Sequence, residues 1–385
     1  MIPLTFCDVA TFYCRSGGGI RTYYNAKLDW FRRQRDHRYV LVIPGRRSSM
    51  AVLSPTVTIV EARGIGISRV SDGYRLFSDL SYIRDAVRRF RPDVLEAGDP
   101  WMSGPIALLC RRDANRPRVV SSFFHSDPIP TYVEPFLRRM TSPRVAHRVS
   151  RAAGCAFSRL QASYDVTMVG SSALGDRLRH EGVTRVLCTP FGVDERFFEV
   201  ARRRLPVAQS RRLLYAGRLD REKQVDLLLA VLPRLFERAD VSVTVAGNGA
   251  FRSEFERLRH PRFRYAGYVH DPDELAALYA GHDIFVAPGA HETFGLAALE
   301  AAASGLLIVG PNQGGVGTLL HEMGSPFSFR AGDPESFLAT LMAALEADWP
   351  RASIASRALA ARYGTWGDAV SRLVGTYERL VEAVQ

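Results

Sequence analysis

The chain has 385 residues, of which 46% are hydrophobic and 24% are charged, a balance ordinary for a globular protein. Its length exceeds one ordinary core, so two domains of under about 200 residues each are expected. No run of about 18 uncharged apolar residues is present to span a bilayer. The N-terminus lacks the basic start and long apolar stretch of a signal peptide, so the sequence predicts a cytoplasmic protein.

The net charge is +11, from 51 basic and 40 acidic residues, and much of the excess lies before residue 160. The arginine clusters there are Arg32, Arg33, Arg35 and Arg38; Arg88, Arg89 and Arg91; Arg111, Arg112, Arg116 and Arg118; and Arg138, Arg139, Arg144, Arg148 and Arg151. Such an excess predicts contact with nucleic acid or an anionic membrane surface. No zinc-finger spacing, ribonucleoprotein motif or basic zipper accompanies it, so no nucleic-acid partner is expected. Residues 133–151 mix arginine and apolar positions at helical spacing, which fits either a solvated helix face or a surface that docks on acidic lipid headgroups.

The first half of the chain alternates short apolar runs with longer mixed segments. Strands are expected at residues 3–9, 39–43, 57–60, 94–95, 119–124 and 166–169, with helical stretches such as residues 20–33 between them. This is the βαβ rhythm of a doubly wound parallel sheet. Five scattered cysteines, none in a Cys-x-x-Cys pair, are expected to be reduced and mainly buried.

The same rhythm begins again after an arginine-rich break at residues 190–210. Further strands are expected at residues 212–216, 241–246, 263–266, 283–287 and 306–309, and residues 366–384 predict an amphipathic helix that packs back across the first domain. The sequence therefore predicts an α/β fold of two Rossmann-like, doubly wound domains facing across a ligand cleft. The first spans residues 1–192 and is completed by helix 366–385, and the second spans residues 193–365.

Glu292 and Glu300 bracket a predicted strand-to-helix turn. A buried strand ends at a proline and a helix-forming stretch covers residues 296–303, so Glu292 is expected in the loop and Glu300 in the second helical turn. Backbone N–H groups near Phe294, Gly295 and Leu296 would be the unsatisfied donors of a helix start, which favours an anion. Carboxylates accept from hydroxyl groups, so the combination fits a sugar nucleotide. The alternative is a pair of solvated glutamates.

Arg218 and Lys223 follow the strand expected at residues 212–216. Of the 51 basic residues only Lys27 and Lys223 are lysines, so Lys223 is an exception in a chain that almost always uses arginine. A compact ammonium beside an oxygen anion, with the Arg218 fork next to it, would clamp a diphosphate. The alternative is that both are solvated surface charges.

Three glycine-containing turns follow predicted strands. Gly18 and Gly19, in the run Gly17-Gly-Gly19, precede a helix and would let the backbone approach a ligand, or would form a structural turn. Gly247 and Asn248, in Ala246-Gly-Asn-Gly-Ala250, permit the same close approach after another strand. Tyr268 and Val269, in Gly267-Tyr-Val-His270, are suited to gripping a nucleobase.

His125 follows the strand expected at residues 119–124, in His125-Ser-Asp-Pro-Ile-Pro-Thr-Tyr132. A histidine at the carboxyl end of such a strand points toward the ligand cleft, although a structural role is equally open. Asp271-Pro-Asp273 has the form of a metal-diphosphate motif, but its place before a predicted helix favours an N-cap.

The chain resembles the retaining family 4 glycosyltransferases of the GT-B fold, also called group 1 glycosyltransferases. The features that carry the resemblance are Gly18-Gly19, Thr189-Pro-Phe-Gly-Val-Asp194, Tyr215-Ala-Gly-Arg218 with Lys223, and His291-Glu-Thr-Phe-Gly-Leu-Ala-Ala-Leu-Glu300. They occur in the family's order and span nearly the whole chain. The segment from His125 to Tyr132 is similar to the His-Thr-Asp-x-Pro-x-Tyr region of members that glycosylate lipids, with serine in place of threonine.

The resemblance implies a role for each matching residue. Arg218 and Lys223 would bind the donor diphosphate, and Glu300 the ribose hydroxyls. Glu292 would contact the donor sugar near its reacting carbon, with backbone groups at Phe294, Gly295 and Leu296 reaching sugar and phosphate. Gly19 would approach the phosphate from the other domain, and His125 would lie near the sugar and acceptor. The catalytic set expected is Glu292, His125, Arg218 and Lys223.

By this resemblance we expect a hexosyltransferase that moves a hexose, mannose favoured, from GDP-mannose or a UDP-hexose to a hydroxyl of a glycan or lipid-linked acceptor. Residues 1–192 would bind the acceptor and residues 193–365 the donor. No cofactor is expected, since Arg218 and Lys223 neutralise the phosphates without a metal, and the arginine clusters would place the protein peripherally on the inner face of an anionic membrane. The alternatives are a sugar-nucleotide epimerase of the same fold, a noncatalytic sugar-nucleotide or membrane-binding module and, least favoured, a Rossmann dehydrogenase.

Overall fold

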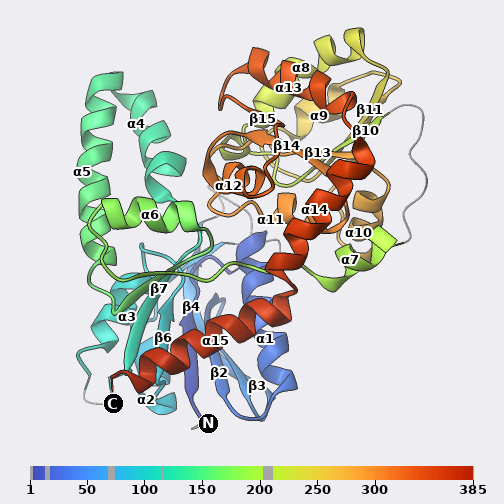
Figure 1. The fold of residues 1–385 in the computed structure, drawn as a ribbon. Coiled ribbons are helices and arrows are strands. Elements are labelled where there is room, and N and C mark those ends of the chain that lie inside the picture. The colour runs from blue at the N-terminus through green and yellow to red at the C-terminus, as the bar shows by residue number, and fades with distance from the viewer. Residues whose placement is uncertain (1–2, 14–17, 68–73, 114–115, 203–210, 385) are drawn as a thin grey trace. The chain divides into compact units, whose positions relative to one another are not determined.

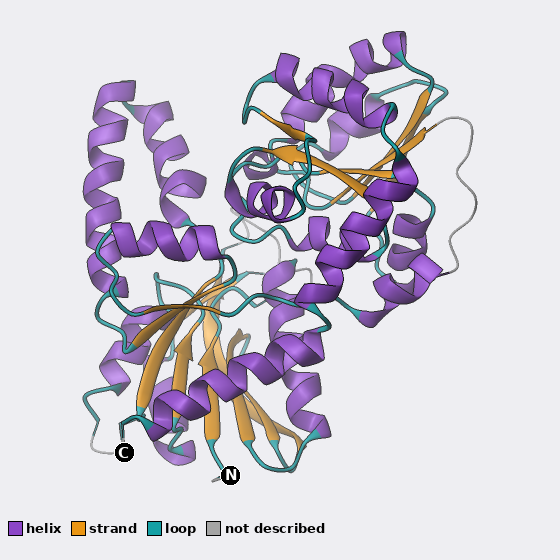
Figure 2. Cartoon of the chain, viewed as in Figure 1, coloured by secondary structure: helices purple, strands orange, loops and turns teal. Residues whose placement is uncertain are grey.

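The computed structural model describes residues 3–13, 18–67, 74–113, 116–202 and 211–384 and divides into two compact units (Figure 1). Unit 1 comprises residues 1–190 and 367–385, and unit 2 comprises residues 191–366. Helices surround a mainly parallel sheet in each unit, which confirms the predicted α/β class (Figure 2). Which unit takes the donor and which the acceptor stays a prediction.

Unit 1 is built on one sheet that has nine strands over the described residues. Its main path runs β3-β4-β2-β1-β6-β7-β8-β9, and β5 pairs with β4. The strands are β1 (Thr5–Val9), β2 (Arg38–Gly45), β3 (Ser49–Ser54), β4 (Val57–Gly66), β5 (Arg75–Phe77), β6 (Val94–Ala97), β7 (Val119–Phe124), β8 (Val166–Val169) and β9 (Val186–Cys188). Every residue of β6, β7 and β8 is buried, as central parallel strands covered on both faces require.

The helices of unit 1 connect these strands as crossovers. They are α1 (Gly19–Arg33), α2 (Leu80–Phe90), α3 (Ser103–Cys110), the π-helical turn η1 (Ile129–Val133), α4 (Glu134–Met140), α5 (Pro143–Gln161), α6 (Ser172–His180) and α15 (Trp366–Glu382). None of the helices in the described ranges is both long and apolar enough to cross a membrane.

One edge of the unit 1 sheet differs from the purely parallel prediction. β3 and β5 both pair antiparallel with β4. Only residues 55 and 56 separate β3 from β4, and a connection that short joins antiparallel strands, whereas a parallel pair needs a crossover. The cysteine expectation is also partly wrong, because Cys7 and Cys110 are buried but Cys155 and Cys188 are exposed. Cys14 lies outside the described residues.

Unit 2 is built on a sheet that has six parallel strands over the described residues, in the order β12-β11-β10-β13-β14-β15. They are β10 (Arg211–Ala216), β11 (Val241–Ala246), β12 (Phe263–Gly267), β13 (Ile284–Val286), β14 (Leu307–Pro311) and β15 (Ser328–Phe329). The helices are α7 (Glu195–Arg202), the 3-10 turn η2 (Arg221–Lys223), α8 (Val225–Arg238), α9 (Arg252–Arg257), α10 (Pro272–Ala280), α11 (Leu296–Ala303), α12 (Gly314–Glu322), α13 (Pro334–Leu345) and α14 (Trp349–Tyr363).

The last helix returns to unit 1. From Gly367 onward α15 belongs to that unit, and its Tyr377 hydroxyl donates to Glu96 Oε2 at 2.6 Å. The Tyr377 ring also lies 6.2 Å from that of Phe6 on β1.

The chain passes from one unit to the other twice, after Pro190 and after Trp366, and the segments next to these two points are joined by main-chain hydrogen bonds. Val193 N donates to Gly364 O at 3.0 Å, and Trp366 N donates to Val193 O at 3.1 Å. A Cβ on Gly192 would lie 2.0 Å from Thr365 O, so only glycine fits there. This close approach accounts for the glycine in the motif Thr189-Pro-Phe-Gly-Val-Asp194.

Candidate functional site

The loop between β13 and α11 holds Glu292 and ends at the helix start, as predicted. Gly295 precedes α11 with φ of 85°, a left-handed conformation that favours glycine, and its carbonyl accepts from Leu299 N at 3.0 Å. The first N–H groups of α11, beginning at Leu296, therefore have no carbonyl of a preceding helical turn to which they can donate. Phe294 anchors the loop, because its buried ring packs on those of Phe191 and Tyr363 at 4.9 and 5.6 Å.

Lys223 and Glu292, which are 69 positions apart, form an ion pair in which Lys223 Nζ contacts Glu292 Oε1. The two side chains are 23% and 25% exposed, so a ligand can reach both. Lys223 closes η2, and the next residue, Gln224, is left-handed with φ of 50°. The Gln224 Oε1 atom accepts from Ala290 N at 2.8 Å, which fixes the Lys223 turn against the Glu292 loop.

Arg218 lies in the turn after β10 and is 45% exposed. Its guanidinium contacts Glu222 Oε1 and lies 3.3 Å from Asp220 Oδ2. The Tyr215 hydroxyl donates to the Arg218 carbonyl at 2.6 Å and holds the turn. Both predicted phosphate-binding cations are thus paired with carboxylates, so a diphosphate would have to exchange with those carboxylates in order to bind.

Glu300 lies in the second turn of α11, and the Tyr279 hydroxyl of α10 donates to its Oε2 at 3.3 Å. Burial raises the pKa of Glu300 to about 8; the Tyr279 hydrogen bond opposes the rise and the charge of Asp194 adds to it. The carboxyl group is therefore largely protonated at neutral pH. Sequence reasoning missed Tyr279, because its contact with Glu300 depends on how α10 packs in the fold.

The turns after β10, β11 and β12 are bonded to one another. A Cβ on Gly247, whose φ is 145°, would lie 1.8 Å from Gly217 O, so the β11 turn packs directly on the β10 turn that leads to Arg218. Asn248 O accepts from Leu219 N at 2.9 Å, and Gly247 N donates to Gly267 O at 2.7 Å. The predicted glycine turn is therefore needed for packing whether or not it also approaches a ligand.

Tyr268 and Val269 come directly after the Gly267 turn. The Tyr268 side chain is 44% exposed and its ring meets that of His270 edge-on at 4.6 Å. Val269 is partly buried. An exposed aromatic ring at this edge is free to stack on a flat ligand, which is compatible with the predicted nucleobase contact.

The three predicted residues of unit 1 lie near the start of α1 and the end of β7. Gly19 is the first residue of α1 and Gly18 precedes it, while Gly17 lies outside the described residues. His125 follows β7; its ring stacks on Phe123 at 4.6 Å and meets Tyr23 of α1 at 4.7 Å. Burial, and secondarily the charge of Lys27, lowers the pKa of His125 to about 3, so the imidazole is neutral at physiological pH.

A glycine pair that sequence reasoning missed supports the Glu292 loop. Gly315 N donates to the Glu292 carbonyl at 2.6 Å. A Cβ on Gly315 would lie 2.3 Å from the Phe294 backbone carbon, and one on Gly314, whose φ is 72°, would lie 2.5 Å from Ala290 O. The signal was present as Gln313-Gly-Gly-Val316, one residue after the end of β14, because adjacent glycines at a helix start indicate a close backbone approach.

The Asp271-Pro-Asp273 string forms a helix cap. Asp271 Oδ1 accepts from the N–H groups of Asp273 and Glu274 at 2.7 and 3.2 Å, which confirms the predicted N-cap of α10. The Asp273 carboxylate lies 2.9 Å from Arg196 Nε. Within the described ranges no group of three or more His, Cys, Asp or Glu side chains is arranged to hold a metal ion.

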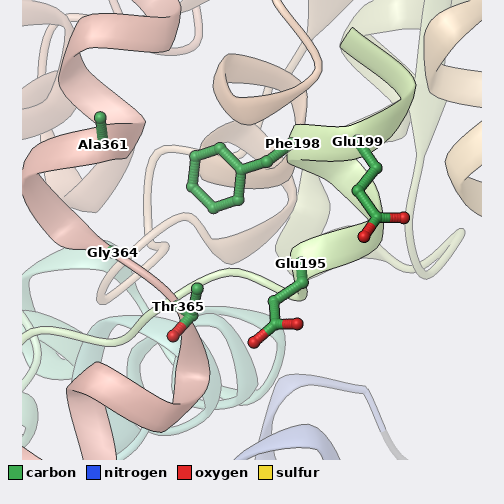
Figure 3. A pocket seen from close by; sticks show the side chains of 6 residues that line it. All are labelled: Glu195, Phe198, Glu199, Ala361, Gly364 and Thr365. Atoms are coloured by element: carbon green, nitrogen blue, oxygen red, sulfur yellow. The ribbon is translucent and has the colours of Figure 1, made fainter. Parts of the chain in front are cut away.

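A separate hollow of about 380 Å³ lies between α7 and the end of α14. Figure 3 shows the Phe198 ring and the carboxylates of Glu195 and Glu199 at this hollow, with Gly364 and Thr365 on its other side. None of the predicted site residues lines it. The hollow therefore lies beside the segments where the chain passes between the units, and it is not part of the Lys223–Glu292 site.

The fold and the site together define a class. Two parallel α/β units, with cations, carboxylates and a glycine-capped helix start gathered at the strand ends of unit 2, have the form of a nucleotide-diphosphate-binding enzyme. Residues 17–197 match the family described as Glycosyltransferase Family 4, and residues 210–347 match Glycosyl transferases group 1.

Two relatives from Mycobacterium tuberculosis are similar over most of the chain. A GDP-mannose-dependent alpha-mannosyltransferase is 30% identical over 300 residues, covering 76% of this chain and 74% of the relative. A GDP-mannose-dependent alpha-(1-6)-phosphatidylinositol dimannoside mannosyltransferase is 28% identical over 306 residues, covering 77% of each. The solved sucrose-phosphate synthase from Thermosynechococcus elongatus has the same fold, with a TM-score of 0.74 at 18% identity over 99% of this chain and 100% of that one.

The chain belongs to the family 4, group 1 glycosyltransferases of the GT-B fold and is a glycosyltransferase enzyme. The predicted family and fold are confirmed. This membership favours a transferase over the epimerase, the noncatalytic module and the dehydrogenase.

Proposed function

We propose that the protein is a retaining glycosyltransferase that moves a hexose, with mannose favoured, from a nucleotide-diphosphate sugar to a hydroxyl of a glycan or lipid-linked acceptor. The observation that carries the proposal is the Lys223–Glu292 ion pair beside the glycine-capped start of α11, with Glu300 in the next turn. The preference for mannose rests on the GDP-mannose dependence named for the two relatives at 28% and 30% identity.

The donor would bind by exchanging ligands with groups already in place. Its diphosphate displaces the carboxylates from Arg218 and Lys223 and accepts from the first N–H groups of α11. Glu300 accepts from the ribose hydroxyls, and the exposed ring of Tyr268 is within the region that takes the nucleobase. Because two cations and a helix start already supply positive charge, we propose that no metal ion is required.

Bond breaking at the anomeric carbon develops positive charge on the sugar and negative charge on the departing diphosphate. Arg218, Lys223 and the helix-start amides stabilise the leaving group as its charge grows. Glu292, freed from Lys223 by the phosphate, faces the positive charge on the sugar. In a same-face attack the departing phosphate oxygen takes the acceptor's proton, so no protein base is required. His125 is neutral, and it would orient sugar or acceptor hydroxyls by hydrogen bonding.

The acceptor would be presented at an anionic membrane surface on the cytoplasmic side. The arginine excess before residue 160 supports this proposal, and so does the similarity of the His125–Tyr132 segment to lipid-acting members of the family. The protein would then act as a peripheral membrane enzyme.

Donor binding tests the proposal directly. Thermal unfolding is measured with GDP-mannose, UDP-glucose and no ligand, each with and without EDTA. A ligand at about 100 times its Kd should raise the free energy of unfolding by about 2.7 kcal/mol, and at equal concentrations of the two sugar nucleotides GDP-mannose should give the larger rise. Transfer to a lipid or glycan acceptor, with the anomeric configuration of the product read by NMR, tests retention. Stabilisation by no sugar nucleotide would contradict the proposal.

A further inference from the structure

The helical hairpin of α4 and α5 leaves large apolar side chains in solvent. No residue of α4 is buried; Phe136 is 60% exposed and Met140 70% exposed. On α5, Val145 and Val149 are 46% and 44% exposed. In Figure 1 the two helices stand side by side and project from the sheet of unit 1, and they contact each other. Packing within the unit therefore does not explain why these positions are apolar.

The exposed apolar residues form one stripe along each helix. Phe136 and Met140 are four positions apart, as are Val145 and Val149, so each pair lies on one helix face. Exposed Ala152 continues the α5 stripe at the next helical position on that face. The face of α5 that is buried carries other residues, including Ala146 and Ser150. The apolar stripe is thus distinct from the face that packs against the unit.

Arginines border the apolar stripe of both helices. Residues 134–151 contain five arginines and one glutamate, and that glutamate, Glu134, pairs with Arg138. Arg139, Arg144 and Arg148 are exposed, and no carboxylate of the described chain pairs with them. At 100° per residue Arg144 and Arg148 lie about 100° around α5 from Val145 and Val149, on the side away from the buried face. Long cationic side chains beside an apolar stripe are the pattern of a helix that lies in a membrane interface.

We propose that the α4–α5 hairpin, residues 134–161, is the surface by which this protein docks on an anionic lipid bilayer. Phe136, Met140, Val145 and Val149 enter the boundary between headgroups and acyl chains, while the arginines bind lipid phosphates. Charge complementarity selects this occupant, because a nucleic acid would use the arginines but would leave the apolar stripe in water. The inference rests on the proposed function only in its biological purpose, which is to bring the enzyme to a lipid-linked acceptor. Docking itself needs neither donor nor acceptor.

The test is sedimentation of the full chain with vesicles of phosphatidylglycerol and phosphatidylcholine, compared with phosphatidylcholine alone. Phe136→Ser with Met140→Ser, and Val145→Ser with Val149→Ser, should each weaken binding to the anionic vesicles at least about tenfold. The matched apolar control is Val52→Ser with Ile65→Ser, at positions of unit 1 that are 72% and 67% exposed outside the hairpin, and it should change binding less than about twofold.

A charge series separates the hairpin from the other basic clusters. Arg139→Gln, Arg144→Gln and Arg148→Gln together should abolish the preference for anionic vesicles. Arg32→Gln, Arg33→Gln and Arg35→Gln remove the same charge at and just beyond the end of α1 and should leave that preference in place. Unfolding temperatures of all variants should match the wild type, since the substituted side chains are exposed.

Three results would overturn the inference: no binding of the wild-type chain to anionic vesicles, full binding by the hairpin variants, or a dimer that the apolar hairpin variants convert to monomer. The last result would show that a second copy covers the stripe. Donor-induced thermal shifts keep the two proposals separable. Hairpin-dependent docking without any sugar-nucleotide shift would contradict the proposed function alone, and normal shifts without docking would contradict this inference alone.

Discussion

Lys223 and Glu292 neutralise each other at the centre of the site, and Arg218 is held in the same way by Asp220 and Glu222. These pairs keep positive charge at a partly exposed site without leaving it uncompensated. Under the proposed function, binding of a diphosphate would release the carboxylates, and the released Glu292 carboxylate would then be available to the sugar. Donor binding and the readiness of Glu292 would then be linked through one ion pair.

Substitution of Glu292 separates binding from chemistry. If Glu292 faces the donor sugar as proposed, Glu292→Gln removes its negative charge while keeping the shape, so turnover should fall at least about 100-fold. Nucleotide affinity should hold or rise slightly, because Lys223 no longer has a competing carboxylate. Lys223→Gln is the matched variant and should weaken nucleotide binding as well as turnover. Steady-state kinetics and nucleotide titration measure both, and near-normal turnover in Glu292→Gln would contradict the assignment.

The raised pKa of Glu300, about 8, predicts a pH dependence of donor binding. Under the proposed function, ribose hydroxyls would donate to the ionised Glu300 carboxylate, so binding would favour the deprotonated form. Nucleotide affinity should therefore increase as pH rises toward 8, by at most about tenfold per pH unit, and level off above it. Glu300→Gln should bind more weakly and lose this dependence. Calorimetric titration between pH 6 and 9 measures it, and parallel profiles for the two proteins would argue against ribose binding by Glu300.

Protein stability should change in the opposite direction. Because the folded pKa of Glu300 lies above its ordinary value near 4.5, the folded state holds a proton that the unfolded state has lost. The associated stability is present in full below the ordinary value and is lost as pH rises through about 8. Donor-free unfolding of the wild type should therefore show a decline across this window that Glu300→Gln lacks.

At the scale of elements, two glycines of the site are needed for different reasons. Gly315 is crowded by the Phe294 backbone, so Gly315→Ala should lower the free energy of unfolding by about 1–3 kcal/mol and displace the Glu292 carbonyl that Gly315 N holds. Gly18 has φ of −79° and open space around its Cβ position, so Gly18→Ala should change stability by less than about 0.5 kcal/mol.

Because the packing of the chain does not require glycine at position 18, the Gly18→Ala variant tests whether a ligand does. If the backbone there approaches a donor phosphate, the added methyl group should lower transfer while leaving unfolding unchanged. Chemical denaturation and transfer assays on the two variants separate these cases. Full activity in Gly18→Ala would remove Gly18 from the site.

The success of the sequence prediction at this scale follows the strength of the apolar signal. β7, β8 and β11 were predicted with their observed bounds because each is a short run of apolar and β-branched residues, interrupted only by serine or threonine, of the kind that favours a largely buried strand. The edge strand β3 is largely exposed and was missed, and β9 and β15 are too short to produce a pattern.

The same limit applies to the site. The loops carrying Glu292 and Arg218 were predictable, because each follows a strand. The partners of these residues were not predictable, because the contacts of Glu300 with Tyr279 and of Lys223 with Glu292 join elements far apart in the sequence. Pairing of that kind is decided by packing between elements, and no local pattern encodes it.

At the scale of the molecule, the chain's other lysine ties unit 1 together. Lys27 on α1 is fully buried, and its Nζ atom lies 2.5 Å from Asp8 Oδ2 on β1 and 3.2 Å from Glu96 Oε1 on β6. The Tyr377 hydroxyl of α15 donates to the same Glu96, and that of Tyr39 donates to Asp8 at 2.7 Å. Burial alone would lower the pKa of Lys27, but the two carboxylates outweigh it and raise the pKa. The last helix is thus held by a charge-assisted hydrogen bond at the centre of the core.

Removal of this lysine should destabilise unit 1 in a pH-dependent way. Lys27→Met leaves two carboxylates buried without a cation, which should cost about 3–5 kcal/mol of unfolding free energy at neutral pH. Both carboxyl groups would then have folded pKa values above their ordinary ones, so the loss should be small near pH 4 and grow as pH rises. Chemical denaturation across this range, with hydrogen exchange of the α15 peptides, measures the effect. Lys27→Met combined with Asp8→Asn and Glu96→Gln removes the buried charge and should recover most of the stability. Wild-type stability of Lys27→Met at pH 8, with α15 still protected, would mean that packing alone holds the helix.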